Sequence, residues 1–158
     1  MDINKHLQRK FLVIVDGTPE SRAALRFAAR RAHGTGGKVT LLLLLGNEQF
    51  KHWLGVEALM REDAQREAEA ILRELSARIE ALGGATPEQY VREGIAVDVI
   101  RDLLAEDPTI STLVLAAGTD PAGPGPLVSA LARGPHEFPI PVTVVPGGLS
   151  DDEIDALT

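Results

Sequence analysis

The sequence contains no cysteine, which excludes disulfide bonds, thiolate metal sites and thiol catalysis and is typical of a reducing compartment. Aromatic residues make up only 4% of the chain, so the core must be built from Leu, Val, Ile and Ala. The longest apolar runs, such as residues 41–45, are far too short to cross a bilayer. The first ten residues are polar and lack the apolar core of a signal peptide. We therefore expect a cytoplasmic protein with no membrane partner.

Positive charge is also in short supply, because the formal net charge is −7. An acidic balance disfavours binding to nucleic acid or to an anionic membrane, so we expect neither partner. Four arginines nevertheless gather within ten residues, at positions 22, 26, 30 and 31. Because three of them recur at four-residue spacing, they lie on one face of a helix, which we interpret as a solvated face.

The usual signatures of nucleotide chemistry and hydrolysis are absent. The sequence has no G-x-x-x-x-G-K-[ST], no G-x-G-x-x-G after its first strand and no G-x-S-x-G. The four histidines are scattered without metal-ligand spacing. We find no nucleophile–base pair, and we expect neither an enzyme nor a metal site.

The most informative segment that is present is FLVIVDGTPES, residues 11–21. Its continuous apolar run predicts a parallel strand that is buried on both faces. Thr18 can serve as the N-cap of a helix whose first position is Pro19. Asp16 is therefore expected at the carboxyl end of a central strand, which is where open α/β sheets bind ligands.

Short strands alternate with helical patterns along the whole chain. Further strands are predicted at 38–45, 89–93, 112–117 and 142–145, and helices at 19–33, 56–82, from 96 to before Pro108, and 127–133. A tail at 150–157 opens with a capping box, Ser150 and Glu153. This order predicts one α/β domain over 1–158: a doubly wound, mostly parallel sheet with helices on both faces, a core at about 10–146 and an acidic tail at 147–158.

If the first and fourth strands are neighbours, their carboxyl ends flank a cleft. One side carries Asp16, Gly17 and Thr18, and the other carries a loop rich in glycine and proline at 118–126. Gly118, Gly123 and Gly125 would let backbone N–H groups approach an anion, and the Ser129 hydroxyl could donate as well. Three prolines remove donors from the same loop. An anion-binding loop and a plain connection therefore both remain open on the residues alone.

Three segments together resemble the universal stress protein family. They are FLVIVDGTPESRAALRFAARRA near the start, VREGIAVDVIRDLLAEDPTISTLVLAAG in the middle and PIPVTVVP near the end. The resemblance covers about residues 10–146. It implies a five-stranded parallel sheet of order 3-2-1-4-5, a role in the stress response, and a dimer formed through the last strands, here Val142, Thr143, Val144 and Val145.

The resemblance also implies a nucleoside-shaped cleft with an altered phosphate cradle. Family members that bind ATP carry G-x2-G-x9-G-[ST] after the fourth strand. Only Gly118 and Ser129 match that motif here, because Leu115 and Val128 stand where its other two glycines would be. Asp16 matches the aspartate beside the nucleoside, and Leu44 falls where backbone meets the base. We expect a stress-response binding protein; the alternative is an ATP- or AMP-binding protein, with Mg²⁺, that hydrolyses ATP slowly at most.

Overall fold

The structure, a computed structural model, describes residues 9–46, 61–133 and 138–158. Strands and helices alternate along the described chain as expected for βαβ units. The elements are β1 (Lys10–Val15), α1 (Ser21–Thr35), β2 (Lys38–Leu45), α3 (Arg61–Ala81), β3 (Glu88–Glu93), α4 (Ala96–Glu106), β4 (Ile110–Ala117), α5 (Pro126–Arg133), β5 (Val142–Pro146) and α6 (Asp151–Leu157). The chain between the predicted strand at 38–45 and the predicted helix at 56–82, together with the first turn of that helix, lies almost entirely outside the described residues.

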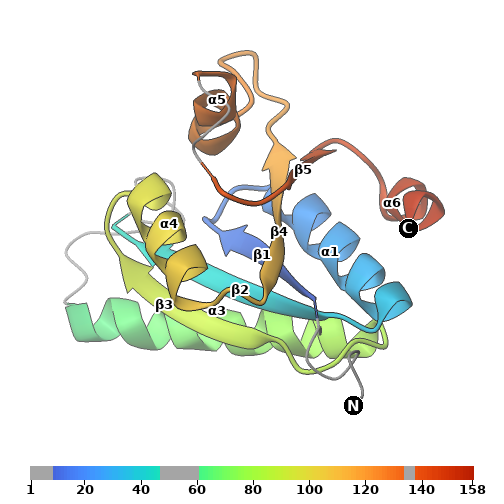
Figure 1. Cartoon of the computed structure of the whole chain (residues 1–158), viewed down its shortest axis with the longest axis horizontal. Coiled ribbons are helices and arrows are strands. Elements are labelled where there is room, and N and C mark those ends of the chain that lie inside the picture. Colours follow the sequence, from blue (N-terminus) through green and yellow to red (C-terminus); the bar gives the residue numbers. More distant parts are fainter. Residues whose placement is uncertain (1–8, 47–60, 134–137) are drawn as a thin grey trace.

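The five strands form one parallel sheet of order β3-β2-β1-β4-β5, which confirms the predicted fold class and strand order (Figure 1). β1 is the central strand and pairs with β2 on one side and β4 on the other. Val13, for example, lies opposite Leu41 of β2 and Val114 of β4. The strand order reverses between β1 and β4, so the carboxyl ends of these two strands define the switch point of the sheet.

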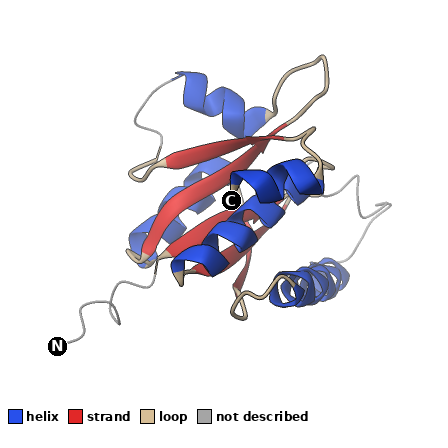
Figure 2. Ribbon diagram, turned by 90° about the vertical axis from the view of Figure 1, so that its right-hand side faces the viewer, coloured by secondary structure: helices blue, strands red, loops and turns tan. Residues whose placement is uncertain are grey.

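Helices cover both faces of the sheet, and each face has its own apolar cluster (Figure 2). Val13 and Val15 of β1 pack on the face of α1 and α3, whereas Leu12 and Ile14 pack on the face of α4. Successive side chains of a strand point to opposite faces, so a strand buried on both faces must be apolar throughout. The uninterrupted run at 11–15 follows from this requirement.

The predicted ends of the first helix are wrong by two residues on each side. α1 starts at Ser21, and Glu20 occupies the N-cap position without a side-chain cap. The Thr18 hydroxyl does not cap the helix, because it donates to Asp16 Oδ1 at 2.7 Å. At the other end the helix continues to Thr35 and is terminated by Gly36, whose φ of 71° is left-handed backbone that favours glycine.

The acidic tail forms α6, and its predicted capping box is confirmed. The Ser150 hydroxyl accepts from the Glu153 N–H at 3.2 Å, and Glu153 Oε1 accepts from the Ser150 N–H at 3.1 Å. α6 packs against α1 and buries Ile154 completely. The chain thus adds a short helix after its last strand.

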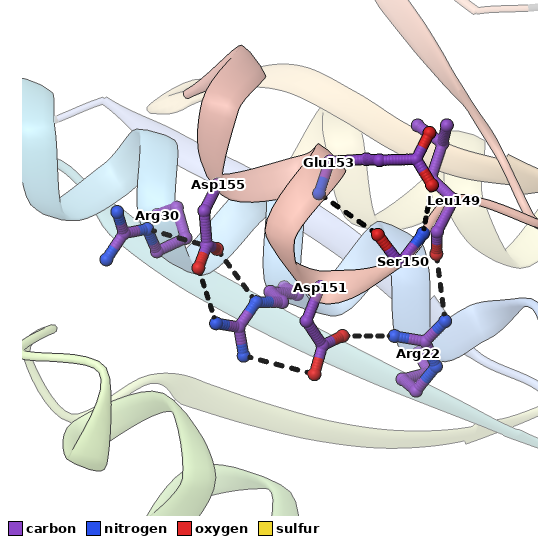
Figure 3. Close-up of polar contacts among 8 residues, drawn as sticks. Arg22, Arg30, Leu149, Ser150, Asp151, Glu153 and Asp155 are labelled. Atoms are coloured by element: carbon purple, nitrogen blue, oxygen red, sulfur yellow. Dashed lines mark hydrogen bonds and ion pairs between the residues drawn. The ribbon is translucent and has the colours of Figure 1, made fainter.

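The arginines of α1 were predicted to be a solvated face; their side chains are partly exposed, and three of them also contact the carboxylates of α6, which the sequence did not predict. Arg22 pairs with Asp151, while Arg26 donates two hydrogen bonds to Asp155, at 2.8 and 2.7 Å (Figure 3). Arg30 Nε lies 3.5 Å from Asp155 Oδ1. The hydrogen bond from Arg26 lowers the pKa of Asp155 and so favours its charged form. These arginines therefore fix the tail helix to the domain.

Four strands are longer than predicted, because β1 begins at Lys10, β3 at Glu88 and β4 at Ile110, and β5 extends to Pro146. Lys10 pairs with Ile110 at the start of β4, ahead of a register shift, which accounts for the earlier beginning of β4.

In the described ranges, no helix combines the length and the apolar character that a membrane crossing requires.

Candidate ligand-binding recess

The two segments expected to form a cleft lie at neighbouring strand ends. Asp16 and Thr18 directly follow β1, and the loop at 118–125 follows β4, which pairs with β1. Gly118 donates its N–H to the Pro124 carbonyl at 2.9 Å, which closes the loop on itself. The predicted meeting of these segments is confirmed by the strand pairing.

An inner recess of about 70 Å³ opens between β1, β4 and the start of α5. Its walls are mainly apolar and include Ile14, Leu115, Leu127 and Val128, with Asp16 among the polar residues. This volume lies well below the roughly 300–1,000 Å³ of typical ligand pockets. The Val128 side chain, which stands where a nucleotide-binding motif has glycine, contributes to the narrowness because it packs among these apolar residues.

An outer recess of about 800 Å³ adjoins the inner one and shares Thr18, Glu20, Gly125 and Pro126 with it. This volume is that of a typical ligand pocket. Its charged lining residues are Glu20, Arg22 and Asp120. The outer recess therefore has charged residues in its lining and adjoins the mainly apolar inner recess.

Most of the predicted site residues line these two recesses. Asp16 lines the inner recess, Thr18 and Gly125 line both, and Gly118, Gly123 and Ser129 line the outer one. Two residues lie elsewhere. Gly17 lines a separate cavity between β1, α1 and α3, and Leu44 is completely buried in the core and lines neither recess.

Asp16 is held in place by the residue two positions later. Its Oδ1 accepts hydrogen bonds from the Thr18 N–H at 3.1 Å and from the Thr18 hydroxyl at 2.7 Å. Its Oδ2 has no hydrogen-bond partner among the described residues. Asp16 thus presents one oriented carboxylate oxygen that can accept hydrogen bonds from a ligand hydroxyl or amine.

The loop after β4 has few backbone donors to offer an anion. Pro121, Pro124 and Pro126 have no N–H, and the amides of three other residues already donate to acceptors of the loop itself. These committed amides belong to Gly118, Ala122 and Gly123. A phosphate cradle depends on several converging free N–H groups. The loop therefore resembles a self-satisfied connection more than an open anion site.

Glu20 and Arg22 also line the outer recess, and the sequence did not single out either of them for this role. They follow Asp16 by four and six residues, at the boundary of the first helix. A signal was available, because a helix start that faces a cleft brings its first side chains to the rim. Arg22 is committed to the tail, since it binds Asp151 and donates to the Leu149 carbonyl at 3.0 Å (Figure 3).

Fold and recess together define the class of this molecule as a doubly wound α/β protein with a ligand-sized recess at its switch point. A family model described as the universal stress protein family matches residues 8–146. The chain belongs to this family, as the resemblance predicted. α6 lies beyond the matched residues. No curated protein matches the sequence.

Solved structures of universal stress proteins have the same fold. One in complex with cAMP has 22% identity and a TM-score of 0.65, and the match covers 90% of this chain and 99% of that one. UspA from Lactobacillus plantarum has 17% identity, a TM-score of 0.64 and coverage of 87% and 97%. A protein from Archaeoglobus fulgidus in complex with dAMP has 21% identity, a TM-score of 0.56 and coverage of 88% and 98%.

Proposed function

We propose that this universal stress protein is a dimeric binding protein of the stress response, and that its two adjoining recesses together take the nucleoside part of an adenine nucleotide. The observation that carries the proposal is Asp16, which lines an apolar recess between β1 and β4 and whose Oδ2 has no hydrogen-bond partner among the described residues. The complexes of the related proteins with cAMP and dAMP support the choice of adenine ligands. We further propose a role without catalysis, supported by the described residues that line the two recesses, which include no histidine, lysine or cysteine.

Titration calorimetry with adenosine, AMP and ATP, the last with and without Mg²⁺, tests ligand binding. We expect adenosine and AMP to bind with dissociation constants below about 1 mM. Asp16→Asn should weaken adenosine at least about tenfold, because it removes a charged acceptor but keeps an oxygen for the Thr18 turn. Asp102→Ala, at an exposed position of α4, is the control and should change nothing. If millimolar ligand produces neither heat nor thermal stabilisation of the protein, the proposal is wrong.

The dimer is proposed to form through β5, the last strand of the sheet. An edge strand leaves a row of unpaired backbone groups that can pair with a second copy. Val144 is 40% exposed on this strand, which is an unusual position for a large apolar side chain. Pro141 precedes the strand and Pro146 is its last residue, so pairing is confined to a short segment.

Val144→Asp should therefore shift the protein from dimer to monomer at tens of micromolar in sedimentation velocity, because it places a charge in an apolar contact. Ile95→Asp is a matched control, since Ile95 is 72% exposed and follows β3, which lies at the opposite edge of the sheet from β5. It should leave the sedimentation coefficient unchanged. A wild-type protein that sediments as a monomer, or a folded Val144→Asp variant that stays dimeric, would contradict this interface.

A further inference from the structure

We infer that Glu20 sets the ligand specificity of the recess by disfavouring polyphosphates, so that a nucleoside or nucleoside monophosphate binds in preference to a triphosphate. This inference rests on the proposed function. It concerns the side where a phosphate chain would leave the nucleoside pocket, which is the outer recess between the α1 start and the loop at 118–125.

The Glu20 side chain lies across the ends of β4 and β5 and fills space that two glycines leave open. A methyl group added at Gly118 would come within 2.9 Å of Glu20 Oε1. One added at Gly147 would come within 2.5 Å of Glu20 Cβ and 2.3 Å of the Ala117 carbonyl oxygen. Gly118, the glycine expected to let backbone meet a phosphate, thus has a carboxylate against it.

This carboxylate has no counter-charge of its own. No described residue donates a hydrogen bond to the Glu20 carboxylate or forms an ion pair with it, and the side chain is only half-buried. Arg22 is the cation of the outer lining, but its guanidinium binds Asp151 and the Leu149 carbonyl. Asp120 adds a second carboxylate to the same lining. The outer recess is therefore negative where a β- or γ-phosphate would lie.

The neighbouring loop does not compensate for this charge. Its three prolines and three internally bonded amides leave few N–H groups that could stabilise a phosphate. An anion placed here would meet repulsion from Glu20 and fewer backbone donors than a loop without these prolines and internal hydrogen bonds would offer. A neutral nucleoside depends on Asp16 and the apolar walls instead, so the Glu20 charge affects it little.

The test compares wild type, Glu20→Gln and Glu67→Gln by calorimetry with adenosine, AMP and ATP, each in EDTA and in Mg²⁺. Glu67 lies on the exposed side of α3, so its substitution makes the same change in net charge away from the recess. In EDTA, Glu20→Gln should increase the affinity for ATP about tenfold, which corresponds to about 1.4 kcal/mol. The affinity for adenosine should change less than about twofold. AMP should fall between them, and Glu67→Gln should match wild type.

The possible outcomes separate this inference from the proposed function. If adenosine binds and Glu20→Gln leaves the ratio of ATP to adenosine affinity unchanged, the inference is wrong and the proposed function stands. If wild type binds ATP tightly only with Mg²⁺ and Glu20→Gln abolishes it, Glu20 is a metal ligand and the inference is overturned. If none of the folded proteins binds any ligand, both fail. Melting temperatures check that the variants are folded.

Discussion

Replacing Ile154 with alanine is expected to lower the free energy of unfolding by about 2 kcal/mol and to expose the backbone of α6 to hydrogen exchange. Ile154 is the buried apolar residue of α6 and is 0% exposed against the α1 side of the core. Truncating a buried isoleucine costs about 2–5 kcal/mol. The lower end applies because a terminal helix can detach, which limits the loss to the free energy of its docking.

Leu157→Ala is the matched control for this prediction. Leu157 lies on the same helix but is 61% exposed, so its truncation should change stability by less than about 0.5 kcal/mol. Hydrogen exchange followed by mass spectrometry reports the tail directly, since only detachment exposes its amides. Equal effects of the two substitutions would show that Ile154 is not packed against α1 in solution.

The second large effect is expected at Lys10. Replacing this residue with methionine should lower the free energy of unfolding by about 2 kcal/mol at pH 7. Lys10 Nζ lies 2.7 Å from Asp107 Oδ2 and 2.9 Å from Glu88 Oε1, and so joins β1 to the starts of β4 and β3. The side chain of Lys10 is 16% exposed, and that of Asp107 is 15% exposed. Removing one member of a fully buried pair costs about 3–5 kcal/mol, and partial exposure reduces that figure.

The cost of Lys10→Met should depend on pH. Burial raises the pKa of Asp107, but hydrogen bonds from Lys10 and Thr109 outweigh it, and the net pKa is below its ordinary value. A carboxyl group whose pKa is lower in the folded than in the unfolded protein stabilises the fold at pH values above its unfolded pKa. This contribution is lost as pH falls through its folded pKa. Urea unfolding should therefore show the difference between variant and wild type shrinking as pH falls below about 4.

Lys38→Met provides the control. Lys38 is the first residue of β2 and lies directly beside Lys10, and its replacement removes the same charge. Lys38 Nζ is 3.9 Å from Glu88 Oε1, at the limit of an ion pair, and it has no contact with Asp107. We expect a cost below about 1 kcal/mol. A Lys38→Met variant as destabilised as Lys10→Met would mean that overall charge, and not this contact, decides the effect.

Much of the fold was predictable because its signals are local. Strands buried on both faces are almost entirely apolar, so the continuous apolar runs at 11–15 and 41–45 were recognisable as strands from the sequence. The apolar side of α3, formed by Ala68, Leu72, Leu75 and Ile79, and the capping box of Ser150 depend on residues three or four positions apart. Strand order was different, because it came from the family resemblance and not from any pattern within the strands.

The helix ends were predicted less well, since they depend on competition between several local hydrogen bonds. Thr18 could cap a helix or bind Asp16, and it binds Asp16. Gly34 could end the first helix, but Gly36 does so with its left-handed backbone. Thr18 suits a cap or a turn, and either glycine suits a helix end, so residue type alone did not decide where the helix begins and ends.

The sequence by itself determined the α/β class, the buried strands and the position of Asp16 at the end of β1. Only the tertiary structure decided what its charged residues contact. Arg26 and Asp155 are 129 residues apart in the chain, and Glu20 meets Gly118 and Gly147 only where three strand ends converge. Periodicity records which side of an element is apolar, but it does not record which distant segment packs there, because that is set by how the strands and helices come together in space.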